Sequence, residues 1–226
     1  MLNILLDADE TILDFPRSSE ESFRFAMQAA GIPAAGGAFE EFKAINDSLW
    51  KEYERGEITK SRLVVERFVR FFARKGIQAD AAAVNKLYFD KLCGTGYLLA
   101  GAREFLDALK ERGKVYLITN GTPPAQYGRL DSLGIRSMFD GIFVSDEIGA
   151  AKPSRAFFDH VLAAVGSRPE ECIVIGDSLS SDIAGAVGAG IPCIWYAPSG
   201  AGASGMKPDH IARSYAEVLH FVDVSE

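Results

Sequence analysis

The sequence predicts an α/β fold, in which a parallel β-sheet is covered by helices on both faces and a block of helices is inserted after the first strand. Short, almost wholly apolar runs alternate with helical patterns through the second half of the chain, which is typical of strands buried on both faces. Residues 16–93 show helical periodicity with almost no strand signal. Polar residues directly follow several apolar runs, at the edge where parallel sheets bind ligands.

Composition limits the kinds of partner. The 226 residues include 24 Lys and Arg against 31 Asp and Glu, a net charge of −7, and no basic run occurs. This argues against binding to a nucleic-acid polymer, and no apolar stretch approaches the length of a membrane span. Three widely spaced cysteines indicate neither a disulfide framework nor a zinc site. We expect a soluble, cytoplasmic protein without a membrane partner, whose oligomeric state the sequence does not indicate.

The first strand is predicted in the apolar run that ends abruptly at Asp7. Residues 11–16 read as a turn, and a helix follows from residue 18 or 19 to about residue 30. Apolar stripes at 39–53 and 63–72 and a further pattern at 79–92 complete a block of four helices. We place this inserted block at residues 16–93, and the α/β core at residues 1–15 and 94–226.

Beyond residue 94 the pattern alternates. Asn120 and Gly121 end a β-rich run, and the prolines after Thr122 suit the first turn of a helix. A Gly- and Ser-rich segment at 199–205 reads as a loop. Strands are predicted at 114–119, 141–145, 172–175, 192–196 and 210–215, and helices at 101–112, 123–133, 154–165, 181–189 and 216–222.

Polar side chains stand at the carboxyl ends of four predicted strands, which share one edge of a parallel sheet. Residues two apart in an extended strand share a face, so Asp7 and Asp9 would repel each other unless a cation lay nearby. A plain Asp-rich turn in which Asp9 caps a helix is the alternative for this stretch alone. In chain order the residues are Asp7 and Asp9, Thr119 and Asn120, Ser145 and Asp146, and Asp177.

Three carboxylates at one edge, those of Asp7, Asp9 and Asp177, require a divalent cation, and an all-oxygen ligand set favours Mg²⁺ over zinc. Lys152 and the amides near Asn120 would balance an anion, although each motif alone reads as an ordinary loop or turn. A magnesium ion, a lysine and backbone amides beside a nucleophilic carboxylate are what phosphoryl transfer requires. No Ser, Cys or His nucleophile is comparably placed.

These segments resemble the four ordered motifs of the haloacid dehalogenase (HAD) superfamily, and the resemblance covers nearly the whole chain. It implies a Rossmann-like catalytic core at residues 1–15 and 94–226, with a helical C1-type cap at residues 16–93. It also implies a Mg²⁺-dependent phosphatase acting on a small phosphomonoester. The segments are Asp7-Ala8-Asp9-Glu10-Thr11, Ile118-Thr119-Asn120, Lys152-Pro153, and Gly176-Asp177 with Asp182.

The resemblance also implies a role for each matching residue. Asp7 would be the nucleophile that becomes an aspartyl phosphate, and Asp9 would act first as acid and then as base. True dehalogenases lack a carboxylate at the position of Asp9, so carbon–halogen hydrolysis is disfavoured. Asp182 would support the metal ligands from behind, or would simply cap a helix. Phosphoryl oxygens would be held by Thr119, Asn120 and Lys152, and Mg²⁺ by Asp7, the Asp9 carbonyl and Asp177.

Within the superfamily, residues 44–50 and 56–59 resemble the cap of the pyrimidine 5′-nucleotidases called YjjG-like, which implies hydrolysis of pyrimidine nucleoside monophosphates. Phosphoglycolate and sugar-phosphate phosphatases share the core motifs and stay open as alternatives. A phosphate- or nucleotide-binding regulator without chemistry is a second alternative. Phe15, Asn46 and Trp50 are candidate substrate-selecting residues, although aromatic residues at helical spacing more often belong to a core.

Two further patterns receive no functional assignment. Gly185, Gly188 and Gly190 have the wrong spacing for a dinucleotide-binding loop, so close packing is the interpretation we adopt. The three histidines have no acidic or cysteine partners at the spacing of metal ligands.

Overall fold

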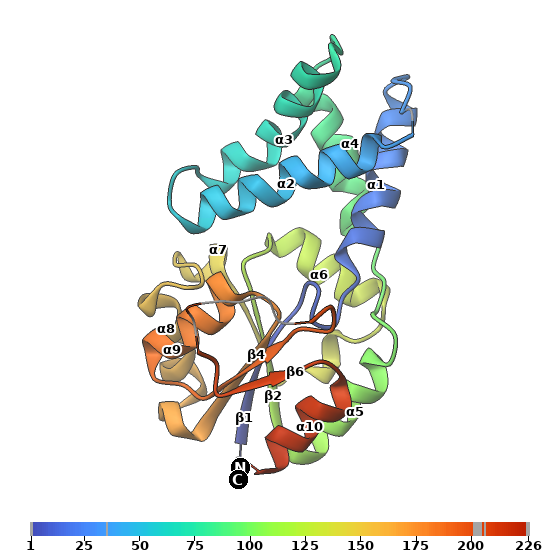
Figure 1. Ribbon diagram of the computed structural model, residues 1–226. Helices are drawn as coiled ribbons and strands as arrows, with labels where there is room; N and C mark the ends of the chain where they lie inside the picture. Colours follow the sequence, from blue (N-terminus) through green and yellow to red (C-terminus); the bar gives the residue numbers. More distant parts are fainter. Residues whose placement is uncertain (1, 35, 201–204, 206, 225–226) are drawn as a thin grey trace. The chain divides into compact units, whose positions relative to one another are not determined.

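The computed structural model describes residues 2–34, 36–200, 205 and 207–224, and the chain divides into two compact units. One unit combines Met1–Asp14 with Leu98–Glu226, and the other is Phe15–Tyr97 (Figure 1). Among the described residues, no helix is both long and apolar enough to cross a membrane.

The first unit is built on one parallel sheet of six strands in the order β3-β2-β1-β4-β5-β6. The chain moves outward from β1 in one direction, returns, and moves outward in the other, so the strand order reverses between β1 and β4. Ligands bind at such a switch point, outside the carboxyl ends of the strands. The strands are β1 Leu2–Asp7, β2 Gly113–Thr119, β3 Gly141–Val144, β4 Cys172–Gly176, β5 Cys193–Tyr196 and β6 His210–Ala212.

Helices cover both faces of this sheet, as Figure 1 shows. Ile4 and Leu6 of β1 pack toward α5 (Ala102–Arg112) and α10 (Tyr215–Val224), whereas Leu5 packs toward α8 (Arg155–Val165) and α9 (Ala184–Ala189). This alternation follows from the two-residue period of a strand. It explains why the odd-numbered and the even-numbered positions of β1 are both apolar. Two further helices follow strands directly: α6 (Pro123–Ser132) and α7 (Ser145–Ile148). The predicted fold class is confirmed.

The second unit consists of four helices around an aromatic core. Phe23, Phe42 and Phe68 are almost completely buried, with ring centroids 4.8 Å apart for Phe23 and Phe42 and 4.8 Å apart for Phe42 and Phe68. The side chain of Thr59 caps one helix, and that of Asp80 caps the next. The helices are α1 Phe15–Ala29, α2 Ala38–Glu54, α3 Lys60–Lys75 and α4 Ala81–Cys93.

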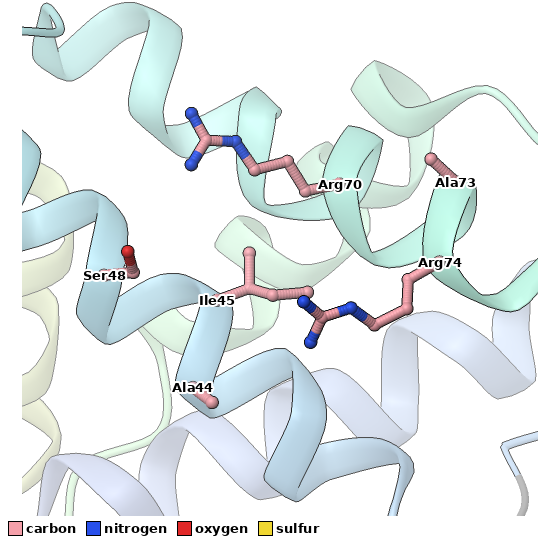
Figure 2. Close-up of a pocket in the computed structure, with 6 residues that line it drawn as sticks. All are labelled: Ala44, Ile45, Ser48, Arg70, Ala73 and Arg74. Atoms are coloured by element: carbon pink, nitrogen blue, oxygen red, sulfur yellow. The ribbon is translucent and has the colours of Figure 1, made fainter.

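A hollow of about 470 Å³ opens in this helical unit (Figure 2). Arg70 at its wall is already neutralised, because its guanidinium donates to both carboxylate oxygens of Glu52, at 2.6 and 2.9 Å, and to Glu66 at 3.1 Å. Among the described residues that line it, Ser48 supplies the only hydroxyl, and no acid or histidine is among them to activate it. Its lining residues are Ala44, Ile45, Ser48, Arg70, Ala73 and Arg74.

Four local details differ from the sequence-based expectation. The strand expected at 210–215 ends at Ala212, because the chain turns into α10, which begins at Tyr215. The first helix begins at Phe15, because Pro16 fits the first helical turn. The expected helix at 181–189 is instead a wide turn over Leu179–Ile183, with π-type hydrogen bonds, followed by α9. The short helix α7 follows β3 where no helix was expected. Most of the loop predicted at 199–205 lies outside the described residues.

The expectation of close packing is confirmed at Gly185 and is wrong at Gly188 and Gly190. A Cβ atom at Gly185 would lie 2.1 Å from a ring carbon of Phe158 and 3.1 Å from the Cα of Pro153. At Gly188, one turn later on the same helix, nothing lies within 4 Å of such an atom. Gly190 ends the helix with φ 71°, a left-handed conformation that favours glycine.

We predict opposite stability effects for Gly185→Ala and Gly188→Ala. The first overpacks the contact with Phe158 and lowers the free energy of unfolding by about 1–3 kcal/mol. Gly188→Ala adds a methyl group in open space on a helix. It raises the free energy of unfolding by about 0.4–1 kcal/mol, because the unfolded chain loses conformational freedom. Urea denaturation measures both, and a destabilisation of similar size in the two variants would contradict this packing.

Candidate active site

Lys152 connects the ends of three strands. Its ammonium donates to Asp7 Oδ1 at 2.6 Å, to Asp182 Oδ1 at 2.7 Å and to the carbonyl oxygen of Ile118 at 2.9 Å. Asn120 fixes the backbone of this lysine from both sides, since its Oδ1 accepts from the Lys152 N–H at 2.9 Å and its Nδ2 donates to the Lys152 carbonyl at 2.8 Å. The ammonium is buried and its three hydrogen atoms are all used.

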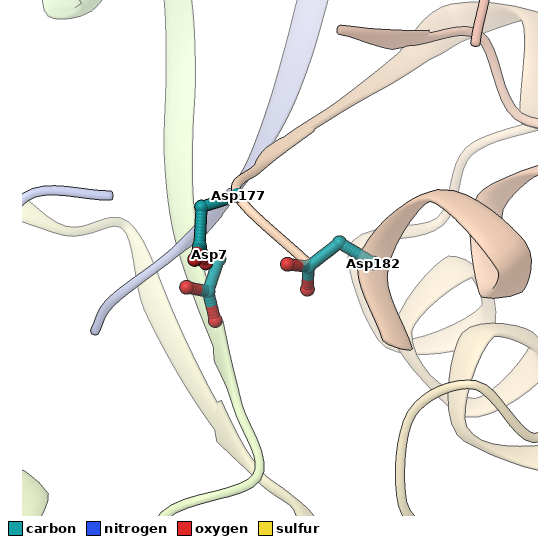
Figure 3. A group of neighbouring side chains, drawn as sticks. All are labelled: Asp7, Asp177 and Asp182. Carbon is teal, nitrogen blue, oxygen red and sulfur yellow. The ribbon is translucent and has the colours of Figure 1, made fainter. Parts of the chain in front are cut away.

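Three carboxylates surround one point beside this ammonium (Figure 3). Asp7 ends β1, Asp177 follows β4, and Asp182 comes from the wide turn after β4. One oxygen from each lies within 4.8 Å of the others, so the group could hold a metal ion. Gly176 makes room for the group, because a Cβ atom there would lie 2.3 Å from Asp182 Oδ2.

The charges of this group do not balance. The carboxylates of Asp7, Asp177 and Asp182 with the single ammonium of Lys152 leave a formal charge of −2 in a largely buried space. Burial, followed by repulsion from neighbouring carboxylates, raises the pKa of Asp7 to about 7 and that of Asp177 to about 9. Burial alone would lower the pKa of Lys152, but Asp182 and Asp7 outweigh it and raise that pKa. An all-oxygen donor set with this excess charge fits a hard divalent cation.

Asp9 lies in a separate environment, against the buried side of α6. Arg129 holds it with both nitrogen atoms of its fork, Nη1 donating to Oδ1 at 2.6 Å and Nη2 to Oδ2 at 3.1 Å. Gln126 Nε2 donates to the same Oδ2 at 2.8 Å and to Thr119 Oγ1 at 2.9 Å. Arg129 and Gln126 are buried, whereas 30% of the Asp9 side chain is exposed.

Sequence reasoning missed Gln126 and Arg129. Both lie on the buried side of α6, together with Ala125 and Leu130. Two polar residues three apart, on the apolar face of a helix that directly follows a site-bearing strand, were the available signal.

The loop after β1 is tight and strained at one residue. The N–H groups of Ile12 and Leu13 both donate to the carbonyl of Ala8, at 3.0 and 2.8 Å. Glu10 has φ 63°, a left-handed conformation in which glycine carries the least strain. Thr11 Oγ1 donates to Asp7 Oδ2 at 3.2 Å, so the loop also orients the carboxylate of Asp7.

The predicted core residues fall into two linked groups. Asp7, Lys152, Asp177 and Asp182 form the first, supported by Asn120. Asp9 and Thr119 form the second and are joined through Gln126. Ser145 and Asp146 begin α7.

The three candidate substrate-selecting residues belong to the helical unit. Phe15 begins α1. Asn46 is buried and accepts from Arg67 Nη1 at 3.3 Å. Trp50 packs edge-to-face on Tyr53, with ring centroids 5.7 Å apart.

Comparison with known proteins identifies relatives along most of the chain. HAD-hydrolase YfnB of Bacillus subtilis is 31% identical over 98% of this chain and 95% of its own. A crystal structure of that protein bound to magnesium superimposes with a TM-score of 0.93, at 30% identity and 98% coverage of both chains.

Two further relatives are named pyrimidine 5′-nucleotidases. PynA of Streptococcus pneumoniae is 32% identical over 97% of this chain and 94% of its own. YjjG of Escherichia coli is 31% identical over 85% of this chain and 84% of its own.

The family-level comparison covers the part of the chain that carries the side chains at the sheet edge. The sequence model for haloacid dehalogenase-like hydrolases matches residues 1–190, which include both linked groups of site residues. This match and the relatives above 30% identity show that the chain belongs to the haloacid dehalogenase-like hydrolase family.

Proposed function

We propose that this protein is a Mg²⁺-dependent phosphomonoester hydrolase that works through an aspartyl phosphate on Asp7, with pyrimidine nucleoside 5′-monophosphates as substrates. The observation that carries the proposal is the separation of two neighbouring carboxylates. Asp7 contacts Lys152 within the acidic group, whereas Asp9 contacts Arg129 and Gln126. Carboxylates in different environments can take different roles in one reaction.

In the proposed reaction Asp7 attacks phosphorus in line, and the bond between phosphorus and the ester oxygen breaks. For this step Asp9 must carry a proton, which its 30% exposed side chain takes from solvent, and it gives that proton to the departing oxygen. Asp9 then takes a proton from a water molecule, whose oxygen attacks the phosphorus of the aspartyl phosphate. Inorganic phosphate leaves and the carboxylate of Asp7 is regenerated.

Thr119, the Asn120 amide and Lys152 are the proposed ligands of the phosphoryl oxygens. Thr119 stands at the end of β2, and its Oγ1 accepts from the Gly121 N–H at 3.0 Å. All three donors of Lys152 are already used. A phosphoryl oxygen therefore reaches this ammonium only by replacing or sharing one of its hydrogen bonds.

Asp7, the carbonyl of Asp9 and Asp177 are the proposed ligands of Mg²⁺, with Asp182 behind them or as a further ligand. When bound, the ion would neutralise charge on the transferring phosphoryl group. The excess charge of the acidic group and the magnesium-bound structure of the Bacillus subtilis relative support this choice of ion.

The helical unit is proposed to act as the cap that selects the substrate, with Phe15, Asn46 and Trp50 as candidate contacts. Both ends of the inserted segment leave the core at one place, because Leu13 bridges Leu98 and the Leu99 N–H donates to the Ile12 carbonyl at 3.0 Å. A paired attachment of this kind suits a hinge. The names of the two nucleotidase relatives support the choice of substrate.

We predict that Asp7→Asn lowers turnover of UMP by roughly 10³-fold or more while the fold is kept, since the variant lacks the nucleophile. Phosphate release with Mg²⁺ measures turnover, and circular dichroism checks the fold. Asp131→Asn is a matched control, because Asp131 is an exposed aspartate whose carboxylate pairs with the exposed Arg136, outside the proposed site. Near-normal turnover by the Asp7 variant would refute the mechanism.

We predict that UMP, dUMP and dTMP are hydrolysed with higher kcat/KM than purine monophosphates, phosphoglycolate or sugar phosphates. The expected reason is selection by the cap, since the core chemistry is the same for every phosphomonoester. A preference for phosphoglycolate or a sugar phosphate would overturn the substrate assignment and leave the core mechanism intact. Absence of phosphate release across the whole panel would favour a non-catalytic binding protein.

We predict that Asp177→Asn is more heat-stable than the wild-type protein in EDTA, by a margin that grows from pH 5 to pH 9. The pKa of Asp177 is raised to about 9 in the folded state, so over this range the folded protein keeps a proton that the unfolded chain has lost. Stability of the wild type therefore falls as the pH rises, and the asparagine variant avoids this loss. Melting temperatures across the pH series measure the margin.

Addition of Mg²⁺ at pH 8 should reverse the order, because the ion binds the folded wild-type protein and stabilises it. Equal stabilisation of both proteins by Mg²⁺ would show that Asp177 is no ligand.

A further inference from the structure

The contacts around Asp9 form a clamp whose parts all come from α6. Arg129 is fixed along its own helix, since its Nε donates to the Ala125 carbonyl at 3.2 Å, and its two terminal nitrogens then reach the two oxygens of Asp9. Such a bidentate pair sets both the position and the plane of a carboxylate. One buried side chain, that of Arg129, therefore contacts both oxygens of Asp9.

Gln126 adds a second constraint to the same carboxylate. Both hydrogens of its Nε2 are used, one on Asp9 and one on Thr119, while its Oε1 is buried without a hydrogen-bond partner in the described structure. The reversed amide would place Oε1 against the carboxylate of Asp9, so the donors must face that way. The orientation that serves Asp9 is kept even though a buried acceptor stays unsatisfied, which is unfavourable.

Gly121 leaves the space that Gln126 occupies. A Cβ atom at this position would lie 2.2 Å from Gln126 Nε2. This glycine, in the loop between β2 and α6, therefore permits the close approach of the Gln126 amide to Asp9 and Thr119. Gln126 and Arg129 are the two residues of α6 that contact the carboxylate of Asp9.

We propose that Arg129 and Gln126 are positioning residues that hold the carboxylate of Asp9 in the orientation needed for proton transfer to the departing ester oxygen. This inference rests on the proposed function. Asp9 lies in a loop and is partly exposed, so without the clamp its side chain would sample several rotamers. Proton transfer requires a fixed donor within hydrogen-bond reach of the acceptor, and orientation of this kind contributes to catalysis.

The leaving group distinguishes positioning from a purely structural role. When the phosphorus–oxygen bond of UMP breaks, the electron pair goes to a strongly basic ribose oxygen, which takes the proton from Asp9. When 4-nitrophenyl phosphate reacts, the pair goes to nitrophenolate, a stable anion that departs without a proton. Loss of the clamp should therefore slow hydrolysis of UMP strongly, whereas the first release of nitrophenolate from 4-nitrophenyl phosphate should be slowed far less.

The test compares wild type, Arg129→Met, Arg129→Lys, Gln126→Leu and the control Arg136→Met, all with Mg²⁺. Arg136 is an exposed arginine paired with Asp131. Gln126→Leu keeps the buried volume and removes the unsatisfied oxygen, so it is expected to fold even if Arg129→Met does not. Steady-state kcat with UMP and the rapid-quench burst of nitrophenolate are measured on each protein.

For Arg129→Met we expect kcat with UMP to fall roughly 10²-fold, the lower range for general acid catalysis, while the nitrophenolate burst stays close to the wild-type rate. Gln126→Leu should show the same split with a smaller loss, because Arg129 still holds both oxygens. Arg129→Lys should recover only part of the UMP turnover, since an ammonium has the charge but not the planar fork. Arg136→Met should match wild type.

If a folded variant lost UMP turnover and the nitrophenolate burst to the same extent, or kept UMP turnover unchanged, the positioning role of Arg129 and Gln126 would be refuted. The proposed hydrolase mechanism would stand in either case. If Arg129→Met does not fold, Gln126→Leu tests the proposal, through the difference between its loss of UMP turnover and its loss of the nitrophenolate burst. Failure of the wild type to release phosphate from either ester would overturn the proposed function and the inference together.

Discussion

The ammonium of Lys152 is the constraint on which the site depends. It is buried and hydrogen-bonded to Asp7, Asp182 and the carbonyl of Ile118, so it ties the ends of β1 and β2 to the turn that follows β4. Removing one partner of a buried ion pair costs about 3–5 kcal/mol, because the remaining charge is left uncompensated. The fold and the site are therefore coupled, and the carboxylate of Asp7 is held in place before any ligand arrives.

The topology explains why these groups meet. The strand order reverses between β1 and β4, so the connections that follow these two strands run to opposite faces of the sheet, which is where α/β folds typically bind ligands. Asp7 ends β1 and Asp177 follows β4, and Gly176 lets Asp182 approach both from the wide turn. A regular α-helix beginning at the same residue would direct its side chains differently, since the π-type turn changes the angle between successive residues.

The sequence was sufficient for the fold class and for the meeting of Asp7 with Asp177, because both follow from local patterns. It also grouped the carboxylate of Asp9 with them, whereas the structure pairs that carboxylate with Arg129. Apolar runs identify buried strands, and an acid directly after such a run must lie at the sheet edge. The wide turn before α9 was not predictable, since it depends on contacts between the turn and β4. Gln126 and Arg129 were missed for a related reason: a polar residue on a helix reads as solvent-facing until the structure shows what lies opposite it.

Asp7 and Asp9 are only two residues apart in the chain, but their carboxylates have very different charged neighbours. Asp9 is neutralised by Arg129, so it adds little to the −2 excess formed by the three other carboxylates and Lys152. A phosphomonoester is itself an anion, and a fourth uncompensated carboxylate at the same edge would repel it. Pairing Asp9 with an arginine from α6 therefore lets an acidic group beside the nucleophile coexist with an anionic substrate, while the excess negative charge stays where a divalent cation can neutralise it.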